Sequence, residues 1–342
     1  PIESFMTSGD RIQGRLQEQG GKGLFTKELD EALLDGRIDA AIHSMKDLPT
    51  RLPPGIVLAC VPEREDPRDG FIALCAKSLV ELPAGATVGT ASLRRQAQTL
   101  HLRPDLKVEL LRGRVETRLA KIESGAFDAT YLALAGLRRL GLERHAASIV
   151  DSEAMPPAPA QGALAVTVRE GDAKTLALFA PLDITEHAIA TTCERAFLQA
   201  LDGSCRTPIA ALARISNGTI DFMGEVLTPD GKHRWRRRES VALGGDGQEI
   251  ARALGARLGA EIVAEAGPLY RAHFGDHGWV GLGKAPDLGA ASRSQPSELT
   301  GDTPCSTNAT SSPPPSPWPR QRRDAQTADP TPARRSARSR AA

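Results

Sequence analysis

A short pattern of residues occurs twice in this chain, and it restricts the possible folds more than any other feature. Each copy has an amphipathic stretch, then glycine, any residue, an apolar residue, aspartate and alanine, at residues 36–40 and again at 125–129. Glycine after such a stretch is typical of a left-handed helix cap, and the apolar residues that follow are typical of a strand. The repeat therefore predicts two similar α/β domains.

Further elements are expected around the two copies. Apolar periodicity predicts helices over residues 24–34, 92–101 and 115–123, and strands over 2–7, 38–43, 86–89, 107–111, 127–134 and 163–168. Strands and helices that alternate at these lengths argue for an α/β fold with mixed, mostly parallel sheets. Because the chain opens inside an expected strand, without methionine, we expect that an N-terminal piece is missing.

The second half of the chain predicts a different, smaller domain. Prolines at 156–159 indicate a linker, and the strand over 163–168 is expected to return to the first domain. Asp183 and Glu186 predict a capping box at the start of a helix that runs to residue 201. Alternating stretches at 209–215 and 219–226, with a helix over 249–264, then predict a small α+β domain.

These elements define the expected domain boundaries. Domain 1 comprises residues 1–62 and 163–180, domain 2 residues 68–156 and domain 3 residues 185–276. Residues 285–342 are rich in Pro, Ser, Thr and Arg. This tail contains too little apolar surface to offset the entropy of ordering, so we expect it to be disordered.

Composition excludes several classes of protein. The net charge of +1 provides no global attraction to nucleic acid or to a membrane surface. No apolar run approaches the ~20 residues of a membrane span. The five cysteines lie at irregular spacings without a CxxC pair, which argues against a disulfide framework and a structural zinc site. We therefore expect a cytoplasmic protein without a metal.

Arginines are concentrated where strands end. Nine lie between residues 94 and 144. Arg94 and Arg95 begin a predicted helix directly after a strand. Arg112 ends another strand, Arg118 lies on the next helix, and Arg139 follows a turn at residues 135–136. Ligands of open α/β sheets bind outside the carboxyl ends of strands, and guanidinium groups suit carboxylates. The pattern favours a polyanion site over ordinary surface charge.

Two further groups are candidates for chemistry. The turn over residues 44–47 follows a strand and includes Lys46 and Asp47; an ionised Asp47 could stabilise a developing cation, although a surface salt bridge is the alternative. Cys205 follows a helix end and precedes Arg206, which favours its thiolate, although an inert loop cysteine is the alternative. Cys193 lies on the apolar face of the preceding helix and is expected in the core.

Several motifs resemble the porphobilinogen deaminase family, also called hydroxymethylbilane synthases, and the resemblance covers roughly residues 1–275. They are GGKGLFTKEL at 20–29, HSMKDLP at 43–49, EREDPRD at 63–69, VGTASLRRQ at 88–96, LRGRVETRL at 111–119, LALAGLRRLGL at 132–142 and PAPAQGAL at 157–164. GSCRTPIA at 203–210 resembles the family's cofactor loop.

The resemblance implies a fold and an activity. The first two domains would be like periplasmic binding proteins, and the third would carry the cofactor cysteine. The enzyme would be a transferase that condenses four porphobilinogen units head to tail, with loss of ammonia, onto a dipyrromethane cofactor. Hydrolysis would then release linear hydroxymethylbilane for tetrapyrrole (heme) biosynthesis. One cofactor per subunit would be covalently bound, and the protein would be a monomer without nucleic-acid or membrane partners.

The resemblance also implies roles for individual residues. Asp47 would be the catalytic acid, and Cys205 would hold the cofactor by a thioether. Cofactor and substrate carboxylates would be bound by Lys46, Arg94, Arg95, Arg112, Arg118 and Arg139. Ser44, Thr90 and Ser92 would add hydrogen bonds. Lys22 would lie on a mobile loop over the site, and Gln161 near a hinge.

One departure from the family keeps alternatives open. The family's first strand and helix, with an Arg-x-Ser-x-Leu-Ala motif, have no counterpart here, so we expect reduced stability or activity. The alternatives are an N-terminally truncated inactive remnant and a non-catalytic anion-binding module in which Cys205 is unmodified. A cysteine hydrolase is a further alternative, with His43 or His187 as its base.

Overall fold

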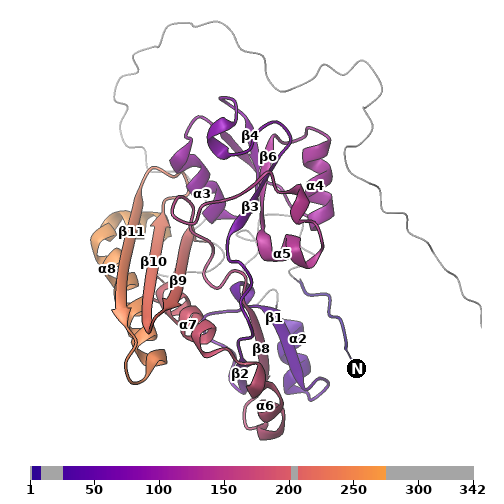
Figure 1. The fold of residues 1–342 in the computed structure, drawn as a ribbon, viewed down its shortest axis with the longest axis vertical. Helices are drawn as coiled ribbons and strands as arrows, with labels where there is room; N and C mark the ends of the chain where they lie inside the picture. The colour runs from indigo at the N-terminus through magenta and orange to yellow at the C-terminus, as the bar shows by residue number, and fades with distance from the viewer. Residues whose placement is uncertain (1, 9–25, 202–206, 275–342) are drawn as a thin grey trace, which may run out of the picture. The chain divides into compact units, whose positions relative to one another are not determined.

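Three separate β-sheets organise the protein in the computed structural model, which describes residues 2–8, 26–201 and 207–274 (Figure 1). Their strand orders are β1-β8-β2, β5-β4-β6-β3-β7 and β11-β10-β9. Lys22, Cys205 and the tail expected to be disordered, residues 285–342, lie outside the described residues. None of the described helices has the length and apolarity needed to cross a membrane.

The first sheet brings together strands that are far apart in the sequence. Its strands are β1 (Ala40–Ser44), β2 (Ile56–Cys60) and β8 (Leu164–Arg169), and its helices are α2 (Lys27–Leu34) and α6 (Ala173–Phe179). Strand β8 lies in the middle and is antiparallel to both neighbours. Leu33 of α2 packs on Ala41 and Ile56. The predicted return of residues 163–168 to the first domain is confirmed.

The second sheet mixes parallel and antiparallel pairs. Its strands are β3 (Asp69–Ala73), β4 (Thr87–Gly89), β5 (Lys107–Glu109), β6 (Ala129–Ala133) and β7 (Ser148–Ile149). Strand β4 is parallel to β5 and β6, whereas β3 is antiparallel to β6 and β7. The helices here are α3 (Leu93–Leu102), α4 (Val115–Glu123) and α5 (Leu134–Arg139).

The internal repeat is confirmed in three dimensions. Helix α2 leads through Gly36 into β1, and α4 leads through Gly125 into β6, with glycine φ values of +70° and +71°. Both glycines thus provide the left-handed cap that ends each helix. A short helical turn follows each strand: η2 (Met45–Asp47) after β1, and α5 after β6. The repeat therefore places the Lys46–Asp47 turn and α5 at equivalent positions.

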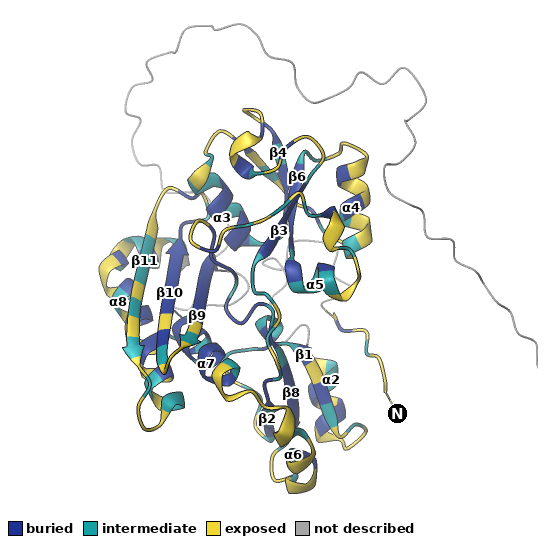
Figure 2. Cartoon of the chain, viewed as in Figure 1, coloured by how far each residue is buried: buried dark blue, intermediate teal, exposed yellow. Residues whose placement is uncertain are grey.

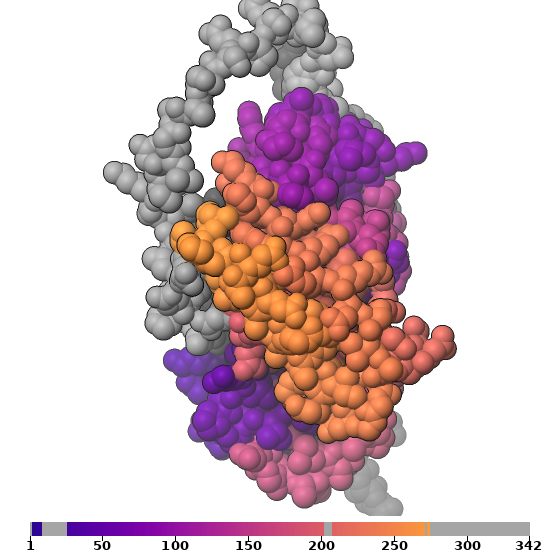
Figure 3. All heavy atoms as spheres, turned by 90° about the vertical axis from the view of Figure 1, so that its left-hand side faces the viewer, coloured from indigo at the N-terminus to yellow at the C-terminus, as the bar shows by residue number. Residues whose placement is uncertain are grey.

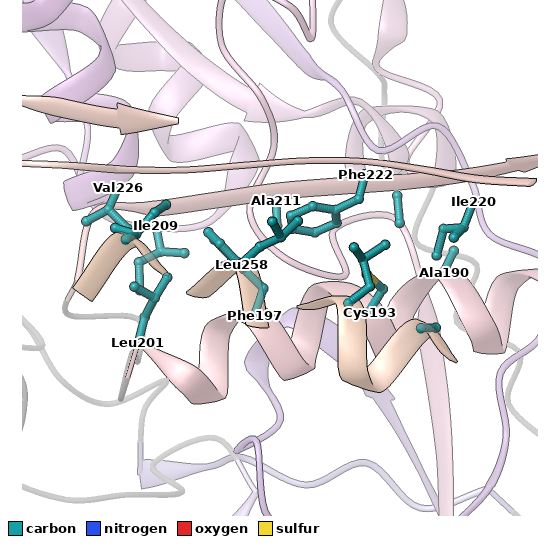
Figure 4. Packing of buried hydrophobic residues seen from close by; sticks show 14 of the residues in the cluster. Ala190, Cys193, Phe197, Leu201, Ile209, Ala211, Ile220, Phe222, Val226 and Leu258 are labelled. Atoms are coloured by element: carbon teal, nitrogen blue, oxygen red, sulfur yellow. The ribbon is translucent and has the colours of Figure 1, made fainter. Parts of the chain in front are cut away.

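The third sheet is antiparallel and packs against two helices. It comprises β9 (Ile209–Ser216), β10 (Thr219–Leu227) and β11 (Arg234–Ala242), with α7 (Thr185–Ala200) and α8 (Gly247–Phe274). The core between strands and helices includes Phe197 and Phe222, whose ring centroids are 5.1 Å apart (Figure 4). Cys193 is fully buried there, which confirms its predicted place in the core. Helix α8 is kinked at Gly267, before Pro268.

Three further short 3-10 turns complete the described elements. They are η3 (Leu79–Glu81), η4 (Glu143–His145) and η5 (Ala180–Leu182). The predicted α/β fold with mixed sheets and a small C-terminal domain is confirmed, but the proportion of parallel pairs differs. Among the described residues, only β4 with β5 and β4 with β6 are parallel in the two α/β sheets. The reason is that β8 and β3 are each antiparallel to the strands beside them.

Two local predictions need correction, and one strand was missed. Residues 2–7 form no strand, because an alternation of apolar and polar residues needs a partner strand and none pairs with them among the described residues. Ile2 and Met6 are exposed. Asp183 does not cap α7: its Oδ1 accepts a hydrogen bond from Val61 N at 2.8 Å, and no side chain caps the helix. The third strand of the last sheet, β11, was not expected from the sequence.

Strand β11 escaped prediction because its residues do not alternate cleanly between apolar and polar. It is rich in arginine and forms an edge of its sheet, so its residues are half-buried or exposed, whereas β9 and β10 are mostly buried (Figure 2). Its side chains and those of α8 lie on the surface drawn in orange in Figure 3. Several of its arginines pair with glutamates, for example Arg236 with Glu225 at 2.6 Å.

The hairpin between β10 and β11 packs closely on α3, and this contact depends on glycine. Gly231 has φ +72°, and a Cβ atom there would lie 2.5 Å from His101 N and 2.7 Å from Ala97 O. These are backbone atoms, so they cannot move aside as a side chain could. The carbonyl oxygen of Gly231 also lies 2.8 Å from His101 Nδ1.

We predict that Gly231→Ala lowers the free energy of unfolding by about 1–3 kcal/mol more than Gly245→Ala. Both glycines have positive φ, but a Cβ atom at Gly245 would meet nothing within 4 Å, so the difference isolates the clash with α3. Urea denaturation of the two variants measures this difference. Equal destabilisation would contradict the close contact.

Candidate active site

A buried aspartate lies at the edge of the second sheet where the predicted arginines gather. Asp69 begins β3 and pairs in register with Ala133, the last residue of β6. Because β3 is antiparallel to β6, the amino end of β3 lies at the same edge as the carboxyl ends of β4, β5 and β6. The residues that follow β4, which include Arg94 and Arg95, therefore start from the edge where Asp69 lies.

Both arginines bind this carboxylate directly. Arg94 Nη2 donates to Asp69 Oδ2 at 2.8 Å, while Arg95 donates from Nη2 to Oδ1 at 2.7 Å and from Nε to Oδ2 at 3.2 Å. All three residues are buried, with exposed fractions of 3%, 4% and 7% for Asp69, Arg94 and Arg95. Burial acts to raise the pKa of Asp69, but the two guanidinium groups outweigh it and hold that pKa well below its usual range.

Arg94 has one donor without an acceptor. Its Nη1 donates to Gln98 Oε1 at 2.9 Å and to Pro156 O at 3.1 Å. Its Nε is buried and has no hydrogen-bond partner among the described residues. An unpaired buried donor on a cation is costly, and an anionic ligand oxygen would satisfy it.

The turn after β1 contributes a second pair of charges. Lys46 and Asp47 lie in η2, at the carboxyl end of β1, and both are half-buried. Burial lowers the pKa of Lys46; Arg95 and Arg94 lower it further, while Asp47 and Asp69 act to raise it. The charge of Lys46 therefore interacts with the arginine pair of the second sheet, although the two elements belong to different sheets.

Two more arginines extend this cationic group. Burial, together with the positive charges of Arg95 and Arg112, lowers the pKa of Arg118 to about 10. Burial also lowers the pKa of Arg112. Arg118 Nε donates to the carbonyl oxygen of Gly113 at 2.8 Å, which holds the start of α4 against the strand end. These shifts mean that positive charge is crowded here and that a bound anion would relieve it.

Gln161 connects the two α/β sheets at this point. Its Nε2 donates to Pro67 O at 2.7 Å and to Asp69 Oδ1 at 2.8 Å. Pro67 lies on the segment that leads from the first sheet to the second, and Gln161 on the segment that returns. The side chain is buried and thus links both crossing segments to the carboxylate that holds the arginines.

The other predicted site residues have different surroundings. Thr90 Oγ1 accepts from Ser92 N at 3.1 Å, and Ser92 Oγ accepts from Arg95 N at 3.4 Å as the cap of α3, so both hydroxyls shape the helix start. Ser44 is half-buried at the end of β1, and Arg139 is exposed at the end of α5. Their predicted roles, like those of Lys22 and Cys205, stay predictions.

Two buried glutamates were missed by the sequence reasoning. Glu194 binds both terminal nitrogens of Arg64, at 2.7 and 3.0 Å, and also accepts from the backbone N of Ala160 at 2.6 Å and of Ala213 at 2.7 Å. Glu225 accepts from Gln98 Nε2 at 2.8 Å. The residues around a glutamate on a helix or strand do not show whether it is buried. Only the motif that includes Arg64 and Asp69 could have indicated that buried charged partners exist.

The histidines weighed as catalytic bases have structural partners instead. His43 Nε2 lies 3.0 Å from Thr167 Oγ1, and burial lowers the pKa of His43. His187 Nδ1 accepts from Arg64 N at 2.9 Å. No cluster of potential metal ligands occurs in the described part of the chain. Both histidines therefore contribute to packing contacts in the described part of the chain.

Taken together, the fold and the site define an α/β protein built to bind a polycarboxylated ligand. A dipyrromethane with acidic side chains fits this chemistry: Arg94 and Arg95 are buried, the nearby Lys46, Arg112 and Arg118 are half-buried, and Arg94 Nε is unsatisfied. Residues 1–177 match the family described as "Porphobilinogen deaminase, dipyromethane cofactor binding domain", and residues 188–264 match "Porphobilinogen deaminase, C-terminal domain".

Similarity to curated proteins supports the same family. A porphobilinogen deaminase of Caulobacter vibrioides is 54% identical over 269 residues, covering 78% of this chain and 83% of the relative. One of Phenylobacterium zucineum is 53% identical over 270 residues, covering 78% and 84%. The chain therefore belongs to the porphobilinogen deaminase family. Its activity is that of a transferase (EC 2.5.1.61) of tetrapyrrole biosynthesis, with porphobilinogen as substrate and dipyrromethane as cofactor.

Solved structures of other families are only distantly similar. A methionine-binding protein is 17% identical with a TM-score of 0.33, covering 45% of this chain and 72% of its own. A periplasmic sulfonate-binding protein of Methylobacillus flagellatus is 16% identical with a TM-score of 0.27, covering 51% and 52%. The fold class is therefore defined by the three sheets and by the family.

We predict that Asp69→Asn lowers the free energy of unfolding by about 3–5 kcal/mol, because it leaves two buried guanidinium groups without their counter-ion. The control is Asp105→Asn, which removes the partner of Arg103 at the surface and should change stability far less. Urea denaturation at neutral pH compares them. Similar losses for both variants would show that the buried pair is no more important than a surface one.

Proposed function

We propose that the family's reaction is performed here by Asp47 on a chain that grows from Cys205, with its carboxylates bound by the cationic group at the sheet edge. The observation that supports this most strongly is the concentration of positive charge around Asp69, together with the unpaired Arg94 Nε. Porphobilinogen has an acetate and a propionate, so each added unit brings two negative charges that such a site can neutralise.

The proposed binding set follows from this charge balance. Lys46, Arg94, Arg95, Arg112, Arg118 and Arg139 would bind the carboxylates of cofactor and substrate. Ser44, Thr90 and Ser92 would donate hydrogen bonds. Lys22 would lie over the site on a loop, and Gln161 would act at a hinge, which the contacts of Gln161 with both crossing segments support.

Asp47 would act on the reacting pyrrole. Each condensation joins the aminomethyl carbon of porphobilinogen to the free α-carbon of the preceding ring; ammonia leaves from the first and a proton from the second. Positive charge develops on pyrrole nitrogen during both steps, and the Asp47 carboxylate would stabilise it and transfer protons. When bound, dipyrromethane supplies the terminal ring from which extension starts.

We also propose the domain organisation, the oligomeric state and the cellular location of the protein. We assign the three sheets to domains with the boundaries expected from the sequence, and every described strand falls within them. A monomer is proposed on the family resemblance. A cytoplasmic location is supported by Cys60 and Cys193, which are buried and form no disulfide in the described part of the chain.

The attachment to Cys205 is tested by intact-mass analysis after incubation with porphobilinogen. We expect the chain and the control Cys75→Ser, which changes an exposed cysteine, to gain the mass of two linked pyrroles. Cys205→Ser should gain none and should not turn over. An unmodified Cys205 in protein that still makes the tetrapyrrole would refute the attachment; unmodified and inactive protein would favour an anion-binding module or a remnant.

Asp47→Asn should retain the cofactor mass but lower kcat by ~100-fold or more, because the amide cannot neutralise charge developing on the pyrrole. The control Asp35→Asn removes an exposed carboxylate of the same domain and should leave kcat unchanged. Steady-state consumption of porphobilinogen measures both. Unimpaired turnover in Asp47→Asn would exclude Asp47 from the mechanism.

A further inference from the structure

Helix α7 contacts the turn that carries Lys46 and Asp47 through one arginine. Arg195 donates from Nη2 to Pro49 O at 2.6 Å and from Nη1 to Leu48 O at 3.3 Å and Met45 O at 3.5 Å. These carbonyls belong to η2 and to the residues that leave it. A single guanidinium thus binds the backbone on both sides of Lys46 and Asp47.

A second residue of α7 supports the same segment. Gln199 lies one helical turn after Arg195, so the two side chains share a face of α7. With its amide oxygen turned toward Arg51, Gln199 accepts from Nε and Nη2 of that arginine at 3.2 Å each. Helix α7 therefore holds the chain from Met45 to Arg51 at two points.

The opposite side of the turn is fixed by the first sheet. Met45 N donates to Ala163 O at 3.0 Å, just before β8 begins. Leu48 N donates to Met45 O at 3.2 Å, which closes the turn itself. The backbone of Lys46 and Asp47 is consequently held between β8 and α7, and Arg195 provides three of the contacts on the α7 side.

Within the described part of the chain, Arg195 forms no ion pair, and its hydrogen bonds go to backbone carbonyls. Burial lowers its pKa to about 10, so the group remains charged at neutral pH. A half-buried guanidinium without a carboxylate is unfavourable unless its donors are needed elsewhere, and here both Nη1 and Nη2 donate to one turn.

We propose that Arg195 is a positioning residue for Asp47: it orients the η2 backbone relative to α7, the helix whose end leads in sequence to Cys205. The inference rests on the proposed role of Asp47. Displacement of a reacting group by ~1 Å can lower a rate by ~100-fold, so the loss of this three-carbonyl contact should appear in kcat rather than in ligand binding.

The test is a double-mutant cycle with Arg195→Gln and Asp47→Asn, scored by kcat, KM, cofactor mass and melting temperature. Arg195→Gln alone should lower kcat by ~10–100-fold with KM changed less than ~3-fold and the cofactor mass retained. In the Asp47→Asn background it should cause no further loss, because Arg195 acts through Asp47. Arg195→Lys, which keeps the charge but not the fork, should recover only part of the rate.

The controls separate positioning from simple stability. Arg252→Gln removes an exposed arginine of α8 and should leave kcat unchanged. If Arg195→Gln fails to fold, Gln199→Ala replaces it in the cycle, since it loosens the same segment through Arg51. Losses that multiply in the double variant, full recovery by Arg195→Lys, or unchanged kcat in Arg195→Gln would each overturn the proposal.

The cycle also distinguishes this inference from the proposed function. If Asp47→Asn alone retains full turnover, the catalytic role of Asp47 is wrong; a slow Arg195→Gln would then act by another route, which equally refutes positioning through Asp47. If Asp47→Asn is slow and Arg195→Gln is normal, the proposed function stands and only the role of Arg195 fails.

Discussion

The site depends on one buried carboxylate. Asp69 accepts hydrogen bonds from Arg94, Arg95 and Gln161, and thereby joins helix α3, strand β3 and the segment that returns to the first sheet. Without an anion at this point, two guanidinium groups could not be kept so close together away from water. The orientation of the two guanidinium groups therefore follows from this one residue.

The third sheet and its helices act as a frame for both halves of the site. On one side, Gln98 of α3 donates to Glu225 of β10, and the β10–β11 hairpin packs on the same helix. On the other, α7 contacts the turn after β1, while Glu194 of α7 binds Arg64 on the segment that crosses between the sheets. These buried polar contacts are directional, so they specify one arrangement more strictly than apolar packing alone.

Local features were predictable from the sequence, and tertiary pairings were not. The glycine caps at Gly36 and Gly125, and the bounds of α4, follow from signals within a few residues, and the structure agrees with them. The gathering of arginines at strand ends was likewise visible, because parallel strands share a direction. Asp69 was missed as their partner because its position depends on β3 entering its sheet antiparallel, which no local pattern reveals. Asp183 has the residue type of a helix cap, yet a tertiary contact with Val61 uses its carboxylate.

The two edge strands of the third sheet differ in whether they are covered, and this difference affects aggregation at high protein concentration. One edge is covered: Ala211 N of β9 donates to Pro157 O of the returning segment. The other, β11, pairs with no further strand in the part of the chain that the structure describes. An open edge invites strand addition from a second molecule, but the first half of β11 presents charged arginines at residues 234 and 236–238, and charged side chains on an edge strand oppose such pairing. The arginines that hid this strand from sequence reasoning therefore disfavour aggregation through that half of the edge.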